Sequence, residues 1–262
     1  MDFKAYIFDL DGTIYLGETL LPGAKDIINT IRNQGKKILF LSNNPLRTRE
    51  DYVEKLTRMG IPISIDEIIN SSFVLCQHLK ELERGATVFP IGEEPLREEL
   101  IRNGFSTSQR PEEIRYVIAS FDRTFVYEKL IVALKAIKGG AHFIATNLDR
   151  TCPFEEGELP DAGAIIGAIE GMTGHRVQWV AGKPSQIMAD AIVEHLNLET
   201  EEILMVGDRL ETDIAMGQHG FKTALVLSGI TKKEDLKHST WKPDCIFAGI
   251  WEVNQLLKEV TK

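Results

Sequence analysis

The sequence lacks several features that would place a chain of 262 residues in a particular class of protein. Its three cysteines, Cys76, Cys152 and Cys245, lie far apart and form no C-x-x-C pair, so no thiolate metal site or redox motif is recognisable. Their number is odd as well, and a reduced, cytoplasmic setting is the simplest expectation. No stretch reaches the roughly 20 apolar residues that are needed to span a bilayer, so we expect no membrane association.

Signals for secretion and for nucleic-acid binding are also missing. Charged residues near the start of the chain interrupt any apolar run of the signal-peptide type; they are Asp2, Lys4, Asp9 and Asp11. The 30 Lys and Arg residues are outnumbered by 39 Asp and Glu, which gives a formal net charge of −9. A broad nucleic-acid surface needs clustered Lys and Arg, so we expect no nucleic-acid partner. A small anionic molecule is compatible with this charge, because local charge at a site can oppose the net charge.

What the sequence does contain is enough apolar material for a large core, since 43% of its residues are hydrophobic. Two segments, 1–82 and 178–262, alternate short apolar runs with amphipathic helical patterns. Such an order is typical of a parallel sheet with crossover helices. Residues 83–177, between them, show further short strands and helices. We therefore predict an α/β protein with a discontinuous core, 1–82 and 178–262, and an inserted domain, 83–177.

The apolar runs and periodic patterns also locate individual elements. In the core they predict strands at 6–8, 37–41, 179–181, 203–206 and 223–227, and helices around 27–31, 52–59, 187–196 and 212–218. In the inserted domain they predict strands at 87–91, 115–119 and 142–145, and helices around 130–137 and 164–172. The segment 152–163, rich in Pro, Glu and Gly, is predicted to be a loop.

Two carboxylates, Asp9 and Asp11, stand where the first apolar run ends. In an open parallel sheet, ligands bind at the carboxyl ends of the strands. A spacing of two residues can turn both side chains toward one site. Paired carboxylates there suit a nucleophile with a general acid–base, or a metal site. The alternative is a solvated turn, because Asp-Gly is common in turns.

Two more polar segments follow predicted strands. The string Ser-Asn-Asn at 42–44 offers a hydroxyl and backbone N–H groups that can hold a phosphate oxygen, and the same residues suit a helix N-cap. Lys183 stands between a glycine and a proline after the apolar run at 179–181. A lysine there is a compact charge that can neutralise an anion, although an ordinary surface lysine would fit the same pattern.

Asp208 and Asp213 follow the strand predicted at 203–206. Their carboxylates are hard oxygen ligands of the kind that Mg²⁺ accepts, and acids that favour a helix N-terminus are the alternative. Because the carboxyl ends of parallel strands meet at one edge of a sheet, we expect all of these segments to converge. Acids, a hydroxyl and a lysine are the parts that a phosphoryl-transfer site needs: nucleophile, metal ligands and counter-charge.

Four segments, taken in order, resemble the motifs of the haloacid dehalogenase (HAD) superfamily of phosphatases: Asp9-Leu10-Asp11-Gly12-Thr13, Ser42-Asn43, Lys183-Pro184, and Gly207-Asp208 with Asp213. The insert resembles the C2-type cap of the branch that contains the nitrophenyl phosphatases and NagD, with similar cap segments at 146–150 and 161–170. The resemblance implies a Rossmann-like parallel sheet with helices on both faces, plus an inserted α/β cap domain. It also implies Mg²⁺-dependent hydrolysis of small phosphomonoesters through an aspartyl-phosphate, with sugar phosphates as natural substrates and p-nitrophenyl phosphate as an artificial one.

The resemblance further implies a role for each motif residue. Asp9 is expected to attack phosphorus, and Asp11 to protonate the leaving oxygen and then activate water. Ser42, Asn43 and Lys183 are expected to hold the phosphoryl oxygens.

The same resemblance implies a Mg²⁺ site. Asp9, Asp208 and the backbone carbonyl of Asp11 are expected to bind the ion, and Asp213 is expected to orient a metal-bound water or a neighbouring ligand.

In the inserted domain, Asn147, Asp149 and Arg150 are the residues expected to read the substrate, and a turn built by Asn and Asp is the alternative. A phosphoglycolate or nucleotide phosphatase, and a non-catalytic sugar-phosphate sensor, are alternative functions on the same scaffold. Sensors of that kind usually lose the nucleophile or the acid, whereas Asp9 and Asp11 are both present. The sequence leaves open whether the chain is a monomer or a homodimer.

Overall fold

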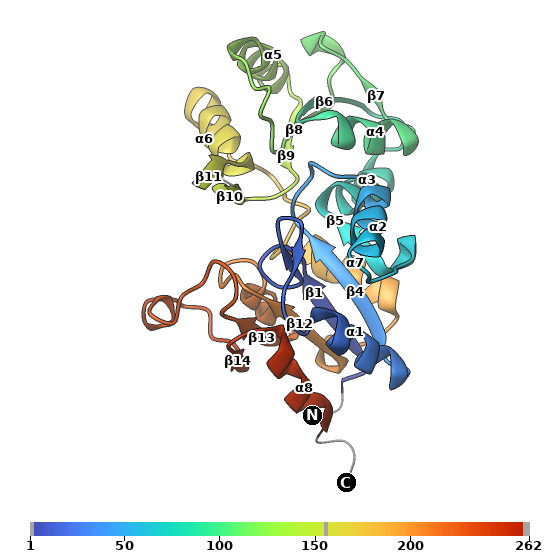
Figure 1. Ribbon diagram of the computed structural model, residues 1–262. Coiled ribbons are helices and arrows are strands. Elements are labelled where there is room, and N and C mark those ends of the chain that lie inside the picture. The colour runs from blue at the N-terminus through green and yellow to red at the C-terminus, as the bar shows by residue number, and fades with distance from the viewer. Residues whose placement is uncertain (1–2, 155–156, 259–262) are drawn as a thin grey trace. The chain divides into compact units, whose positions relative to one another are not determined.

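Figure 1 shows the computed structural model, which describes residues 3–154 and 157–258. The ends of the expected core, 1–2 and 259–262, and residues 155–156 of the expected loop lie outside the described residues. The chain divides into two compact units, each with its own sheet. The core unit comprises Met1–Ser42, Arg49–Ile69 and Lys183–Lys262, and the inserted unit comprises Asn43–Thr48 and Asn70–Gly182.

The core unit is built on a six-stranded sheet. Its strands are, in spatial order, β14 (Cys245–Phe247), β13 (Lys222–Val226), β12 (Ile203–Gly207), β1 (Ala5–Asp9), β4 (Lys37–Ser42) and β5 (Ile68–Asn70). β1 pairs in parallel with β12 and β4, so Ala5 lies beside both Ile203 and Lys37. The β1 and β4 arrows lie side by side in blue in Figure 1. The carboxyl ends of β1, β4 and β12 therefore meet at one edge.

Helices bury the faces of this sheet. They are α1 (Ala24–Asn33), α2 (Arg49–Arg58), α7 (Gln186–Leu196) and α8 (Asn254–Lys258), joined by 3₁₀ turns at Ile65–Glu67, Thr200–Glu202, Ile214–His219, Asp235–Lys237 and Ile250–Val253. Tyr6 and Phe8 of β1 pack in one apolar cluster with residues of α1, α2 and α8. Ala5 and Ile7 alternate to the opposite face and are also fully buried. Because β1 is buried on both faces, its sequence is a continuous apolar run.

A short hairpin follows β1 directly. It consists of β2 (Tyr15–Leu16) and β3 (Thr19–Leu20), which pair antiparallel.

The inserted unit has a parallel sheet of four strands. They are, in spatial order, β7 (Ser106–Thr107), β6 (Thr87–Ile91), β8 (Tyr116–Ala119) and β9 (His142–Ala145). Its helices are α3 (Ser71–Leu82), α4 (Glu94–Arg102), α5 (Tyr127–Lys138) and α6 (Ala162–Thr173), with a 3₁₀ turn at Pro111–Glu113. Apolar residues of α5, α6 and the sheet form one cluster. The predicted α/β fold class is therefore confirmed.

The division into units differs from the predicted boundaries, 1–82 with 178–262 against 83–177. Helix α3 packs on α4, which places residues 70–82 in the inserted unit. Residues 178–182 also belong there, because the N–H groups of Gln178, Ala181 and Gly182 donate to carbonyls of β9 and the residue after it.

Three predicted elements need correction. The run 179–181 forms only an isolated bridge between Val180 and Ala145 rather than a core strand. The predicted loop 152–163 overlaps a hairpin of β10 (Thr151–Phe154) and β11 (Gly157–Pro160). The prediction was wrong because Pro and Gly, which are frequent here, are typical of loops. The helix predicted at 212–218 is the 3₁₀ turn Ile214–His219. Within the described residues, no helix combines the length and apolar character that crossing a bilayer requires.

Candidate active site

Three polar side chains of the core unit meet at the carboxyl edge of its sheet. Asp9 is the last residue of β1, Asp213 lies in the loop after β12, and Lys183 stands shortly before α7. The Lys183 Nζ donates to Asp9 Oδ1 and to Asp213 Oδ1, each at 2.6 Å. The lysine is 2% exposed and Asp213 is fully buried. The predicted convergence of these three segments is thus seen in the structure.

Asp208 follows β12 directly and joins the same group. Its Oδ2 accepts a 2.6 Å hydrogen bond from the Ile230 N–H. Asp213 Oδ2 accepts from the Arg209 N–H at 3.0 Å, so both oxygens of Asp213 are engaged. Asp9 accepts a hydrogen bond through Oδ1 and Asp208 through Oδ2. The second oxygen of each, Asp9 Oδ2 and Asp208 Oδ1, can therefore bind a further ligand.

The electrostatic balance of the group is negative. Burial, with Asp213 as the main charged neighbour, raises the pKa of Asp208 to about 7. Burial also raises the pKa of Asp9 well above its ordinary value, although Lys183 opposes this. Burial alone would lower the pKa of Lys183, but the carboxylates of Asp213 and Asp9 outweigh it and raise that pKa. Two buried acids, Asp208 and Asp213, and the partly buried Asp9 lie beside one protonated lysine, which leaves an excess of negative charge.

The donor set fits a divalent cation. One carboxylate oxygen from each of Asp9, Asp208 and Asp213 lies within 4.8 Å of the others. Among the described residues, this is the one group of three or more His, Cys, Asp and Glu side chains with that proximity. All the ligand atoms are hard oxygens, which suit Mg²⁺ and not a soft metal.

Two glycines make room for Asp208. A Cβ atom on Gly229 would lie 1.9 Å from Asp208 Oδ2, and one on Gly12 would lie 2.6 Å from the same oxygen. Gly12 also has a φ of +85°, a conformation that glycine adopts without strain. The backbone therefore approaches this carboxylate more closely than any larger residue would allow.

Asp11 is the exposed residue of an otherwise buried turn that begins directly after β1. Backbone hydrogen bonds close the turn. The Gly12 N–H donates to the Tyr15 carbonyl at 2.8 Å, and the Thr13, Ile14 and Tyr15 N–H groups donate to the Leu10 carbonyl at 3.2, 2.8 and 3.2 Å. The Gly12 carbonyl in turn accepts from the Ser228 hydroxyl at 2.7 Å. The turn is thus held by backbone contacts on both sides of Asp11.

Ser42 ends β4, and its buried hydroxyl lies 3.0 Å from the hydroxyl of Tyr52 on α2. Sequence reasoning treated Tyr52 as an ordinary apolar contact of an amphipathic helix. Its hydroxyl is a polar atom in a buried position, and buried polar atoms are normally paired. That rule is the signal that would have directed attention to Tyr52.

The polar residues expected to read a substrate lie in the inserted unit. Asn147 is fully buried, and its Nδ2 donates to Asp149 Oδ2 at 2.9 Å and to Asp161 Oδ1 at 3.1 Å. Asp149 Oδ2 also accepts from the Asn43 Nδ2 at 2.9 Å. Arg150 is exposed. Of the three, Asn147 is therefore built into the fold, as the alternative of a structural turn proposes.

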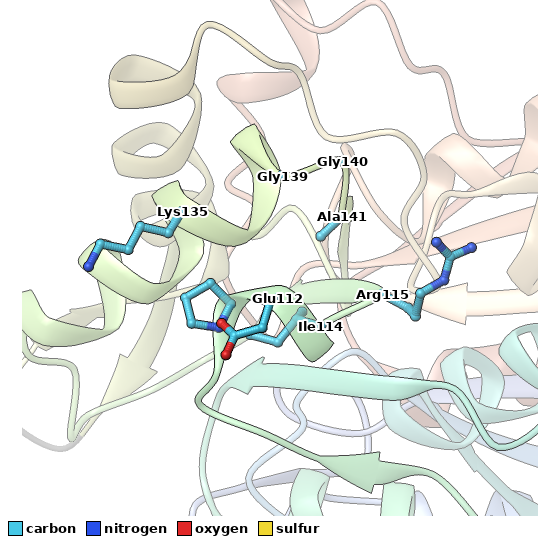
Figure 2. Close-up of a pocket in the computed structure, with 8 residues that line it drawn as sticks. Glu112, Ile114, Arg115, Lys135, Gly139, Gly140 and Ala141 are labelled. Carbon is cyan, nitrogen blue, oxygen red and sulfur yellow. The ribbon is translucent and has the colours of Figure 1, made fainter.

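A separate hollow of about 540 Å³ lies in the inserted unit, near the amino ends of β8 and β9. Figure 2 shows Lys135 and Arg115 on opposite sides of it. Arg115 is paired with the Glu83 carboxylate at 3.3 Å. Ligands of open parallel sheets bind at the carboxyl ends of the strands, so this hollow is at the wrong edge for the predicted chemistry.

Comparison with known proteins gives a consistent result. A family model described as haloacid dehalogenase-like hydrolase matches residues 6–106, and a second HAD-hydrolase-like model matches 180–253. Sugar-phosphatase AraL of Bacillus subtilis is 39% identical, over 97% of this chain and 93% of its own. The 5′-nucleotidase YutF of the same organism is 35% identical, over 92% and 93% respectively. The solved p-nitrophenyl phosphatase of Archaeoglobus fulgidus has a TM-score of 0.93 and 34% identity, covering 98% of this chain and all of that one.

Proposed function

The chain belongs to the haloacid dehalogenase-like hydrolase family and is a phosphatase, and we propose that it is a Mg²⁺-dependent hydrolase of small phosphomonoesters, sugar phosphates in particular. The observation that carries this proposal is the buried Lys183, bonded to both Asp9 and Asp213 beside the Asp208 carboxylate. A cation and a surplus of carboxylates at one sheet edge provide separate positions for a phosphoryl group and a metal ion.

Asp9 is the proposed nucleophile. Its carboxylate forms a bond to phosphorus while the bond from phosphorus to the leaving oxygen breaks, which yields an aspartyl-phosphate. Asp11 donates a proton to the leaving oxygen. In the second step Asp11 takes a proton from water, the water oxygen attacks phosphorus, and Asp9 is regenerated as phosphate leaves.

Three residues are proposed to hold the phosphoryl oxygens. Lys183 supplies a fixed positive charge, and Ser42 supplies a hydroxyl that is oriented by Tyr52. Asn43 is proposed to contribute its backbone N–H, because its side-chain amide is donated to Asp149.

Asp9, Asp208 and the backbone carbonyl of Asp11 are proposed to hold Mg²⁺. When bound, the ion would offset negative charge on the phosphoryl group. Asp213, whose two oxygens accept from Lys183 and the Arg209 N–H, keeps the lysine and this loop in place.

The inserted unit is proposed to be the C2-type cap that selects the substrate. The core motifs recognise only a phosphoryl group, which every phosphomonoester shares. We propose that Asp149 and Arg150 contact the rest of the substrate, with Asn147 fixing Asp149. Asp149→Ala should then change relative kcat/KM among sugar phosphates by about 1–3 kcal/mol, the value of hydrogen bonds to a substrate. Equal slowing of all substrates, p-nitrophenyl phosphate included, would instead assign Asp149 to folding or closure.

A panel of phosphorylated metabolites with Mg²⁺ tests the function. It should include sugar phosphates, nucleoside 5′-monophosphates, phosphoglycolate and p-nitrophenyl phosphate, with free phosphate as the readout and the Asp9→Asn variant as the blank. The highest kcat/KM is expected for a sugar phosphate. A nucleotide is the second candidate, favoured by the 35% identity to the 5′-nucleotidase. Release no faster than the blank on every substrate would contradict the proposal. A cytoplasmic location and a monomeric or homodimeric state stay predictions.

A further inference from the structure

The core unit contains a second buried lysine that the proposed chemistry does not use. Lys55, on α2, is 5% exposed, and its Nζ lies 3.7 Å from the centroid of the Tyr15 ring. The carboxylate of Glu18 is 3.6 Å from the same Nζ. Lysine is seldom fully buried without a partner, because desolvating an ammonium is costly. An ammonium at this distance from a ring face is attracted by the ring quadrupole, so Lys55 and Tyr15 hold each other in place.

Tyr15 is the residue that closes the Asp11 turn. It is fully buried, its carbonyl accepts from the Gly12 N–H, and its N–H donates to the Leu10 carbonyl. Asp11 and Tyr15 also form a β-bridge. Tyr15 therefore helps to set the backbone position of Asp11, together with the Thr13 and Ile14 N–H groups, which also donate to the Leu10 carbonyl.

Helix α2 contacts the same hairpin at a second point. Glu18, between β2 and β3, is 2.6 Å from the Arg58 guanidinium and 3.6 Å from Lys55. Arg58 and Glu18 are largely exposed, so that ion pair contributes little. The buried contact, Lys55 on Tyr15, is the one that can fix the turn.

We propose that Lys55 is a positioning residue for proton transfer by Asp11. It holds Tyr15, and through Tyr15 the turn, where the Asp11 carboxyl can protonate the leaving oxygen. This inference rests on the proposed function. A purely structural role for Lys55 is the competing explanation, and the two differ in how the loss of Lys55 depends on the leaving group.

The leaving group separates the two explanations because only some substrates need a proton donor. A sugar alkoxide is a strong base and leaves slowly unless it is protonated, whereas p-nitrophenolate is a weak base that leaves without a proton. General acid catalysis contributes on the order of 10²–10⁴-fold where it is needed. Misplacing Asp11 should therefore slow phosphoryl transfer from a sugar phosphate selectively. This first step is measured by kcat/KM, because the later attack of water on the aspartyl-phosphate is the same for every substrate.

The test compares Lys55→Met with the unmodified enzyme on a sugar phosphate and on p-nitrophenyl phosphate, both with Mg²⁺. We expect kcat/KM for the sugar phosphate to fall roughly 10- to 100-fold, and kcat/KM for p-nitrophenyl phosphate to change by less than about threefold. Lys55→Arg should restore most of the lost rate, because a guanidinium also binds a ring face. Lys25→Met removes an exposed lysine of α1 and should change neither rate.

Circular dichroism establishes that each variant is folded. If Lys55→Met does not fold, Tyr15→Leu replaces it, since this change removes the ring and leaves Lys55 beside Glu18; the same selective loss is expected. An equal fall in kcat/KM on both substrates, or no change in kcat/KM on either, would overturn the inference and show that Lys55 has a structural role only. Failure of the unmodified enzyme to hydrolyse either substrate would contradict the proposed function itself, and the inference with it.

Discussion

The two parallel sheets of this chain both end in buried polar residues, but these residues have different partners. In the core unit, the partners are charges: Lys183 is bonded to Asp9 and Asp213, with Asp208 beside them. In the inserted unit, neutral side chains bond to one another and to two carboxylates. The Thr146 hydroxyl lies 2.9 Å from Ser120 Oγ and 2.7 Å from Asn147 Oδ1, and Asn147 donates to two carboxylates.

The two clusters differ in how their polar groups are paired and in the pKa of their acids. The side-chain amide of Asn147 is hydrogen-bonded through both its oxygen and its nitrogen to residues of the inserted unit, as is usual for buried amides. The core cluster has more negative than positive charge, and burial raises the pKa of Asp9 and Asp208. Burial is common to both, so burial does not mark the functional site. The functional site is marked instead by a buried lysine that two carboxylates share, and by acids whose pKa burial raises.

The largest expected effect tests the charged cluster. Asp9→Asn should fold but lose on the order of 10³-fold or more in kcat/KM, because an amide is a poor nucleophile. Hydrolysis of p-nitrophenyl phosphate measures the loss, and Asp26→Asn, an exposed change in α1, is the matched control. Retention of a tenth of the activity in clean protein would reject Asp9 as the nucleophile.

Metal removal should have the next largest effect. EDTA should lower activity by at least about 10²-fold and Mg²⁺ should restore it, since a cation supplies several kcal/mol of charge stabilisation. Ca²⁺ should inhibit, because its larger and more flexible coordination shell disturbs the geometry. The rate of phosphate release after chelation and after each addition is the measurement. Full activity in exhaustively chelated enzyme would remove the metal role of Asp208.

The neutral cluster should respond in stability. Asn147→Ala removes one hydrogen-bond donor from each of the Asp149 and Asp161 carboxylates and should lower the free energy of unfolding by about 1–3 kcal/mol. The midpoint of urea unfolding measures this, with the exposed Asn29→Ala as control. A variant as stable as the control would show that the cluster contributes nothing to the fold and would remove one side of the comparison.

Asp208→Asn should give a smaller change of opposite sign. In metal-free protein it should raise the unfolding temperature, by about 2–4 °C for each kcal/mol gained, because it relieves a buried excess of negative charge. A carboxyl whose pKa is raised to about 7 costs stability as the pH rises from about 4 to about 7, so the gain from Asn should grow across that window. Calorimetry in EDTA at several pH values measures it, with the exposed Glu211→Gln as control. A lower unfolding temperature at every pH would mean that the acidic cluster is already balanced.

Much of the core site could be predicted because it depends on topology. Once a segment is assigned to a parallel strand, its last residues lie at the ligand-binding edge, and Asp9, Ser42 and Asp208 follow from that rule alone. Lys183 was predicted for the same reason, although the strand before it does not exist in the core sheet. Its place depends instead on its bonds to Asp9 and Asp213.

Other features could not be predicted, since they depend on which residues face each other. Tyr52 and Lys55 fit the helical spacing of α2 as ordinary positions, and nothing in that spacing indicates that they face Ser42 and Tyr15. The assignment of α3 to the inserted unit depends on its packing against α4. Packing of this kind is a tertiary property that local patterns do not contain.

The connectivity of the central strand also has a consequence for synthesis of the protein. β1 is translated early, but one of its two neighbours in the sheet is β12. Ala5 can therefore pair with Ile203 only after residue 203 has been synthesised. The four strands of the parallel sheet in the inserted unit lie close together in the chain, between Thr87 and Ala145, and we expect this sheet to form first. Asp9 therefore meets Lys183 and Asp208 only after the whole insert has left the ribosome. A nascent chain carries no assembled catalytic group, and premature termination before β12 yields an inactive product.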